Sequence, residues 1–171
     1  MPAAPAGPGR GGRAARYADL AGTLARLGLA AVWFVAGTSK LADPGAGYLA
    51  VRAYQVLPNA CIRPVAIGLP LLELLLGLFL LLGLGTRVAA LCSGLLLLAL
   101  IAAIAQSWAR GLSIDCGCFG GGGEIDAGRT RYPQEIARDV GFLALALWLT
   151  LRPRTLLAIP TTGTERTEVP A

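Results

Sequence analysis

Four long apolar runs, separated by short polar segments, dominate the chain. They cover residues 20–41, 64–82, 88–108 and 133–151. Each run is close to the ~20 residues that an α-helix, rising about 1.5 Å per residue, needs to cross ~30 Å of hydrocarbon. Because a backbone in lipid must satisfy its own hydrogen bonds, each run is predicted to be a membrane-spanning helix.

The four runs differ in how polar they are. Residues 88–108 contain no charged residue and are the clearest span. The last run begins with Glu135, Arg138 and Asp139, which leaves only residues 140–151 uncharged. A helix with charges in its first turns needs neighbouring helices to shield them from lipid. The pattern therefore favours a helical bundle over separate crossings.

The composition supports the same class of protein. Of the 171 residues, 55% are hydrophobic and 15% are charged, with a mean hydropathy of +0.63, which is too apolar for an ordinary soluble domain. We predict an all-α integral membrane four-helix bundle with short loops, over residues 19–155. The Pro-, Gly- and Thr-rich segments 1–18 and 156–171 are predicted to be disordered tails. We expect membrane lipid, and no nucleic acid, around the bundle.

Arginine positions predict the orientation in the membrane. They lie before the first run, between the second and third, and after the fourth: Arg10, Arg13, Arg16, Arg87, Arg152 and Arg154. By the positive-inside tendency these regions face the cytoplasm. Both termini are then cytoplasmic, and the loops 42–63 and 109–132 lie on the outer face of a bacterial plasma membrane.

The candidate chemistry is a pair of cysteines, Cys116-Gly117-Cys118, in the second outer loop. Cys61 lies in the first outer loop, whereas Cys92 falls within the third run and is interpreted as a packing residue. Thiols outside the plasma membrane tend to be oxidised, and a disulfide across so small a ring is expected to be easily reduced. Cys116, Cys118 and Cys61 are therefore candidate catalytic residues, with Cys61 able to take over the bond through a mixed disulfide.

Two other interpretations of these cysteines stay open. The first is a static disulfide, for example between Cys61 and one member of the pair. The second is a zinc site, which would need Cys61, Cys116, Cys118 and Asp115, an uncommon set of ligands, so no metal is predicted. The chain has no histidine, which excludes Ser-His and Cys-His nucleophiles and haem ligation by imidazole.

A carboxylate lies deep in the second run. Glu73 is about 14 Å along that helix, near the bilayer midplane, where an unpaired charge costs at least about 3 kcal/mol. Arg138, about 20 Å from the inner end of the last helix, is the preferred partner, and Lys40 is the second candidate. The charge pair either fixes helix packing or takes part in proton or quinone handling.

Five segments together carry a family resemblance. They are residues 37–44, 54–58, 69–77 and 116–120, and Arg138-Asp139 at the start of the last run. In this order the chain resembles the MauE-type methylamine utilisation membrane proteins, within the wider DoxX-like group, over about residues 20–155. Asp139 departs from the asparagine expected there.

The resemblance implies a four-helix membrane bundle involved in redox maturation. Such proteins are thought to help form disulfides in the small subunit of methylamine dehydrogenase, alongside a thioredoxin-like partner. The resemblance draws attention to Lys40, Asp43, Glu73, Cys116, Cys118 and Arg138.

Three functions are compatible with these features. In the first, Cys116 and Cys118 accept electrons from an extracytoplasmic dithiol client, with a quinone between the helices as the candidate electron acceptor. In the second, the protein is a non-catalytic assembly factor or scaffold that holds a structural disulfide. A weaker third is a small transporter with Glu73 and Arg138 along its path.

Overall fold

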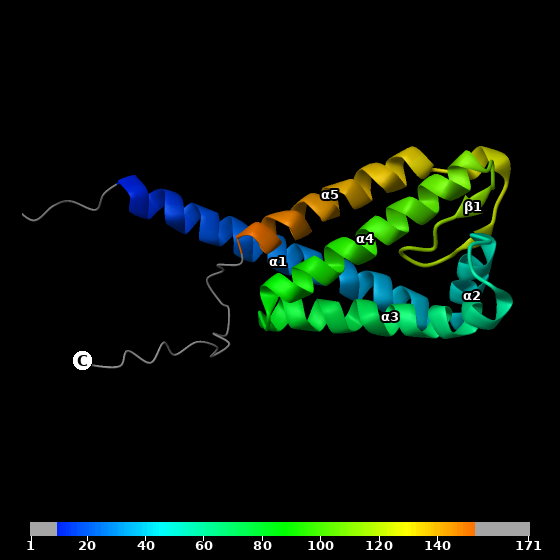
Figure 1. The fold of residues 1–171 in the computed structure, drawn as a ribbon, viewed down its shortest axis with the longest axis horizontal. Coiled ribbons are helices and arrows are strands. Elements are labelled where there is room, and N and C mark those ends of the chain that lie inside the picture. Colours follow the sequence, from blue (N-terminus) through cyan, green and yellow to red (C-terminus); the bar gives the residue numbers. More distant parts are fainter. Residues whose placement is uncertain (1–9, 153–171) are drawn as a thin grey trace, which may run out of the picture.

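The computed structural model describes residues 10–152 and is mostly helical (Figure 1). Its helices are α1 (Arg10–Ala42), α2 (Pro44–Ala53), α3 (Asn59–Leu82), α4 (Thr86–Ala109) and α5 (Tyr132–Leu151). Between α4 and α5 lie two short strands, β1 (Ile114–Asp115) and β2 (Gly123–Glu124), and the 3-10 helix η1 (Ala127–Arg129). Figure 1 shows α2 and the strands at one end of the bundle, opposite the α3–α4 turn and the end of α5.

Three helices are long and apolar enough to cross a membrane. They are the 16–42 part of α1, all of α3 and all of α4. The prediction of a multi-pass membrane protein is confirmed to that extent. Helix α5 does not qualify, because Glu135, Arg138 and Asp139 occupy its first two turns. It packs along α4, while α1 packs along α3.

Small residues let α1 and α3 approach closely. A Cβ atom added to Gly37 of α1 would lie 2.8 Å from Leu74 Cγ, and one added to Gly77 of α3 would lie 3.2 Å from Phe34. Such contacts are typical of helix packing in membranes, where close backbone approach replaces the hydrophobic effect. Across the bundle, the buried Trp33 Nε1 donates a hydrogen bond to Ser93 Oγ at 2.9 Å and ties α1 to α4.

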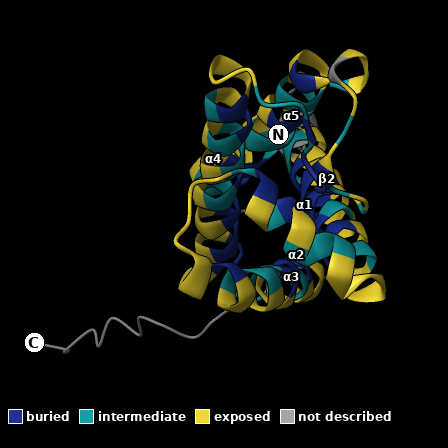
Figure 2. Cartoon of the chain, turned by 90° about the vertical axis from the view of Figure 1, so that its right-hand side faces the viewer, coloured by how far each residue is buried: buried dark blue, intermediate teal, exposed yellow. Residues whose placement is uncertain are grey.

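The outer faces of the bundle are apolar. Figure 2 shows buried residues facing inward and exposed residues facing outward on the long helices. The exposed side chains include Leu71 and Leu78 of α3 and Leu91, Leu95 and Leu98 of α4. A soluble protein rarely exposes so continuous an apolar surface, so these faces are suited to lipid.

The structure corrects several predicted boundaries. Helix α1 begins at Arg10, inside the segment 1–18 that was predicted to be disordered. Helix α2 occupies part of the predicted loop 42–63, where the Asp43 side chain caps it by accepting from the Ala46 N–H at 2.9 Å. The two strands also make the fold less than purely all-α. Residues 1–9 of the first predicted tail and all of the second, 156–171, lie outside the described residues, as do residues 153–155 of the predicted bundle.

Candidate functional site

The loop between α4 and α5 folds back onto the end of the bundle. Strands β1 and β2 pair antiparallel, with Ile114 opposite Glu124 and Asp115 opposite Gly123. Tyr132, at the start of α5, closes the base of this hairpin. Its hydroxyl accepts from the Ile114 N–H at 3.1 Å and donates to the Leu112 carbonyl at 2.6 Å. The Cys-Gly-Cys unit directly follows β1, so the hairpin sets its position.

Glycine is required where this loop meets α2. Gly117 has a φ of 65°, and a Cβ atom there would lie 2.7 Å from Ala50 Cβ. Gly122 has a φ of 113°, and a Cβ atom there would also collide with Ala50. Positive φ values and a close backbone approach both favour glycine over any other residue. The glycines around the cysteines therefore let the loop lie flat against α2.

Both cysteines of the pair are buried. Cys116 is 8% exposed and Cys118 is 6% exposed, within a cluster that also contains Ala53, Ile104 and Tyr132. Both are free thiols in this structure, and the Cys118 N–H donates to Cys116 Sγ at 3.2 Å. The pair is thus buried within the fold rather than displayed on the surface.

Side chains from two other elements anchor the backbone of the pair. The Tyr54 hydroxyl, at the end of α2, donates to the Cys116 carbonyl at 3.0 Å. Lys40, near the end of α1, donates from Nζ to the Cys118 carbonyl, also at 3.0 Å. Each cysteine carbonyl therefore receives a hydrogen bond from a different helical segment, which fixes the turn between them.

Lys40 is also the partner of the buried carboxylate. Lys40 Nζ lies 2.8 Å from Glu73 Oε1 and 2.9 Å from Oε2, and the Glu73 side chain is 1% exposed. The preference for Arg138 as the partner of Glu73 was wrong, and Lys40, the second candidate, takes this place. Because a buried carboxylate without a cation is costly, this pairing accounts for Glu73 deep in α3.

Arg138 belongs to the cysteine site instead. Its Nε donates to Asp139 Oδ1 at 2.9 Å, and its guanidinium lies 4.6 Å from the centre of the Phe119 ring, one residue after Cys118. A guanidinium over an aromatic face is attracted by the ring quadrupole. Arg138 therefore holds the residue that follows the pair against the start of α5.

The pKa values of the two thiols are shifted in opposite directions. Hydrogen bonding from the Cys118 thiol lowers the pKa of Cys116, with smaller contributions from the Cys118 N–H and from Arg138, while burial acts in the opposite direction. The same hydrogen bond and burial raise the pKa of Cys118 well above its ordinary value. Burial likewise raises the pKa of Tyr54, so its hydroxyl stays a donor to the loop. Since the thiolate is the nucleophilic form, this difference favours Cys116 over Cys118 as the nucleophile.

The chain matches the family model of methylamine utilisation protein MauE over residues 18–152. It belongs to the MauE family. A curated relative, methylamine utilization protein MauE of Paracoccus denitrificans, is 38% identical over 98 residues, which are 57% of this chain and 53% of the relative. The match thus covers about half the length of that relative. No solved structure matches the chain.

In this MauE-family protein, Glu135 lies close to the cysteine pair and was not identified as a site residue from the sequence. Ligand-type atoms of Asp115, Cys116 and Glu135 all lie within 4.8 Å of one another. A structural zinc site uses four protein ligands, so we assign no metal to these three groups. Glu135 and Arg138 are three residues apart on α5 and therefore share a helix face, which is the signal that could have pointed to Glu135.

Cys61 lies apart from the pair. It is exposed in the first turn of α3, where its N–H bonds to the Pro58 carbonyl at 2.8 Å. Among the residues that the structure describes, Cys61 forms no disulfide and no hydrogen bond with Cys116 or Cys118. The three candidate thiols are therefore not brought together into one cluster in this state.

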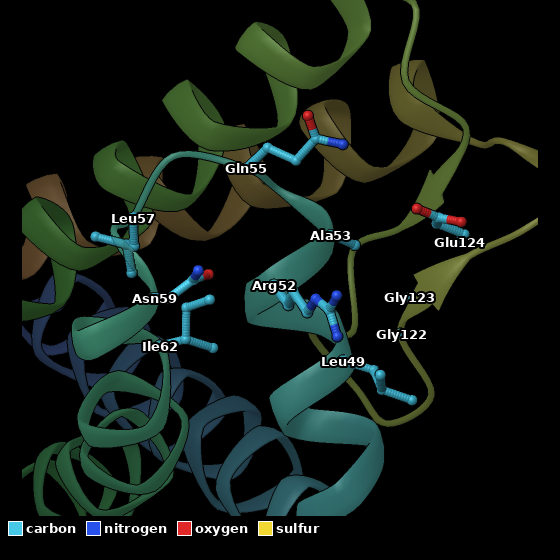
Figure 3. A pocket seen from close by; sticks show the side chains of 10 residues that line it. All are labelled: Leu49, Arg52, Ala53, Gln55, Leu57, Asn59, Ile62, Gly122, Gly123 and Glu124. Atoms are coloured by element: carbon cyan, nitrogen blue, oxygen red, sulfur yellow. The ribbon is translucent and has the colours of Figure 1, made fainter.

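The cavity at the cysteine pair is small, and a larger cleft lies away from it. A cavity of about 40 Å³ touches both cysteines, Lys40 and Tyr54, and it has room for a few water molecules but not for a quinone ring. A larger cleft of about 760 Å³ lies between α2, the start of α3 and β2. Figure 3 shows Leu49, Arg52, Ile62 and Glu124 around this cleft, and neither cysteine lines it.

Proposed function

We propose that this MauE-family membrane protein exchanges disulfides with an extracytoplasmic dithiol client in methylamine utilisation, through Cys116 and Cys118. The observation that carries the proposal is the geometry of the pair: two buried thiols lie side by side, with the Cys118 N–H 3.2 Å from Cys116 Sγ, and each cysteine carbonyl is anchored by a hydrogen bond. The opposite directions in which the two thiol pKa values shift support it. An exchanging pair needs one sulfur that forms the mixed disulfide with the client and a second thiol beside it that is bonded to the first in the oxidised pair and can displace the client from it.

The exchange is balanced between the client and the pair. A client thiolate attacks Cys116 Sγ of the oxidised pair, the bond to Cys118 breaks, and Cys118 leaves with the electron pair. The second client thiol then attacks the client sulfur of the mixed disulfide, a client disulfide forms, and Cys116 leaves. The client dithiol is oxidised by two electrons, the cysteine pair is reduced, and the two client protons end on Cys116 and Cys118.

The reduced pair must then be oxidised again. A thioredoxin-like protein on the same side of the membrane can do this by the same exchange, its own disulfide being reduced in turn. Cys61 is proposed as a secondary thiol that receives the bond if the outer loops rearrange. No bound quinone forms part of this proposal, because the cavity of about 40 Å³ at the pair is too small for its ring.

The proposal includes a topology. Helix α5 is proposed as the fourth crossing of a four-helix bundle of the DoxX-like kind, shielded by its packing along α4. Both termini then lie in the cytoplasm, and α2 and the hairpin lie on the outer face of the plasma membrane. The placement of α2 and the hairpin at one end of the bundle, opposite the α3–α4 turn, supports this arrangement (Figure 1).

One observation favours a second function. Both cysteines are more than nine-tenths buried, as a structural disulfide would be. In this alternative the protein is a non-catalytic assembly factor, and the disulfide only stabilises the outer loop. The alternative predicts a pair that is fully oxidised in cells and never joined to another protein.

Quantitative thiol trapping in cells distinguishes the two functions. Cells are quenched with acid, and free thiols are labelled with a maleimide that shifts the protein on a gel. Exchange predicts a mixture of reduced and oxidised pair. It also predicts a mixed disulfide between Cys116 and the client that accumulates in Cys118→Ser, because this variant lacks the thiol that could displace the client from Cys116. Cys92→Ser is the matched control, because Cys92 is exposed on α4, away from the loop. A pair that is fully oxidised in every condition, with no mixed disulfide, rejects exchange.

The same reagent chemistry tests the topology. A membrane-impermeant maleimide applied to intact, reduced cells should label Cys61, which is exposed at the start of α3. Labelling of Cys61 only after permeabilisation would place this end of the bundle in the cytoplasm and reject the proposed outer face.

A further inference from the structure

A second cleft lies beside the Cys-Gly-Cys unit, because Asp115, the residue before Cys116, lines it. It has a volume of about 680 Å³ and lies between the segment 125–131 and the start of α5. Asp115 and Glu135 line it, and both have carboxylate atoms within 4.8 Å of Cys116 Sγ. Neither Asp115 nor Glu135 lines the larger cleft of Figure 3. Of these two clefts, this one therefore offers the shorter approach to Cys116.

Glu135 has an unused acceptor at this position. Its Oε2 atom is buried and makes no hydrogen bond. A buried carboxylate oxygen without a donor is unfavourable, because the group has lost water and gained nothing in return. A thiol or a water molecule entering the cleft would supply the missing donor. Glu135 is thus prepared to receive a proton at a point next to the reactive sulfur.

The other acidic groups nearby are already engaged. Asp115 Oδ1 accepts from the Gly117 N–H at 3.4 Å and so supports the turn between the cysteines. Asp139 is bound to Arg138 through Oδ1. Tyr54, on the α2 side, gives its hydrogen to the Cys116 carbonyl. Glu135 and Asp139 each keep a buried carboxylate oxygen without a donor, but of these two only Glu135 lines the cleft and lies within 4.8 Å of Cys116 Sγ. Its carboxylate is close enough to hydrogen-bond the Cys116 thiol itself.

We propose that Glu135 is the proton acceptor for the second client thiol, which releases the client from its mixed disulfide with Cys116. The inference rests on the proposed function and adds a residue to it. In the second step of the exchange, the client S–H loses its proton to Glu135 while its sulfur attacks the client sulfur bonded to Cys116. The bond to Cys116 breaks, Cys116 leaves as a thiolate beside Arg138, and Glu135 returns the proton to it. No other reactant is needed.

The test uses the full chain in membrane vesicles, with the cysteine pair oxidised and dithiothreitol as the dithiol. Samples are quenched with acid, and the fraction of reduced pair is followed by maleimide gel shift from pH 6 to pH 10. For Glu135→Gln we expect a rate at pH 6 to 7 that is lower on the order of 10²-fold, typical of the loss of general-base catalysis. The defect should vanish near pH 10, above the usual thiol pKa of about 8.5, because dithiothreitol then supplies its own thiolate. Glu135→Asp should recover part of the neutral rate.

The outcomes separate this inference from the proposed function. A neutral rate for Glu135→Gln that equals or exceeds that of the wild type overturns the inference, since removing a negative charge beside Cys116 should by itself favour the thiolate. A defect of equal size at every pH also overturns it, because it indicates a structural role. Glu124→Gln, on β2 and exposed, is the control and should keep the wild-type profile. If the wild-type pair itself does not react with dithiothreitol, the proposed function fails first.

Discussion

Lys40 and Glu73, from different helices, form a buried ion pair in which Nζ lies 2.8 Å from Oε1. The same Nζ atom donates to the Cys118 carbonyl at 3.0 Å. One ammonium group therefore connects a carboxylate within the apolar part of α3 to the backbone of the cysteine loop. The Lys40–Glu73 ion pair therefore stabilises both the packing of α1 on α3 and the position of the cysteine loop.

Glu73→Gln should destabilise the protein by about 3–5 kcal/mol, because it leaves the Lys40 ammonium buried without a counter-charge. The double variant Lys40→Met with Glu73→Leu should recover much of this loss, since it removes both charges. Thermal unfolding in detergent measures the stability of both variants. A single variant as stable as the wild type would mean that water or lipid headgroups already compensate Lys40.

Loss of the Lys40–Glu73 ion pair should also make the two thiols of the cysteine loop easier to alkylate. In the double variant the Cys118 carbonyl loses the donor from Lys40. We expect the reduced pair to be alkylated several-fold faster than in the wild type, because the loop is less firmly held over its buried thiols. An unchanged alkylation rate in a stable double variant would show that Tyr54 and the hairpin hold the loop without Lys40.

The two thiols should differ in reactivity at neutral pH. The pKa of Cys116 is lowered and that of Cys118 is raised, so more thiolate is present on Cys116 below the ordinary thiol pKa. Brief treatment of the reduced protein with iodoacetamide near pH 7, followed by peptide mass spectrometry, should find Cys116 modified first. As the pH rises through the pKa of Cys118, the preference should narrow. Preferential labelling of Cys118 near pH 7 would reverse the assignment.

Gly117→Ala should open the cysteine loop. Its φ of 65° costs an alanine about 1 kcal/mol, and the new Cβ atom would lie 2.7 Å from Ala50 Cβ, so the loop must also shift. We expect faster alkylation of both cysteines and a lower unfolding temperature. Gly128→Ala is the matched control, because a Cβ atom there meets nothing within 4 Å. Equal behaviour of the two variants would contradict the close packing of the loop on α2.

Tyr54→Phe should weaken the loop by about 1 kcal/mol, the usual worth of one hydrogen bond, because the Cys116 carbonyl loses its donor. We expect a modest rise in the alkylation rate of Cys116 and little change in the unfolding temperature. Tyr48→Phe, within α2, serves as the comparison in the same assay. If both tyrosine variants alter the rate equally, the hydrogen bond is not the cause.

The sequence predicted the apolar helices because each depends only on a local run of residues. The uncharged run 88–108 forms α4, and the less apolar last run forms α5. Because its first turns are charged, α5 is not apolar enough to count as a candidate membrane span. Helix α2 could have been found, since Asp43 followed by Pro44 is a common way to begin a helix. Its short length between two longer runs concealed it.

The partner of Glu73 could not be predicted in the same way. Depth along a helix places a charge between the two membrane surfaces, but the rotation of each helix decides which neighbour it faces. Arg138 lies at a suitable sequence depth, yet it bonds Asp139 and covers Phe119, while Lys40 turns inward. The cysteine pair stood out as a candidate site by its residue types. Its anchoring by Tyr54 and its neighbour Glu135 depend on how the loop folds back, which spacing alone does not encode.

Helix α1 is longer than a bilayer requires. Its 33 residues rise about 50 Å, whereas the hydrocarbon is ~30 Å thick, and Figure 1 shows its N-terminal part extending past the other helices. Lys40 fixes the far end of α1 at the cysteine loop, so the surplus length must emerge at the opposite surface. Under the proposed topology, the first turns of α1 would therefore extend roughly 20 Å beyond the hydrocarbon, as a continuation of the same helix that contacts the cysteine loop through Lys40.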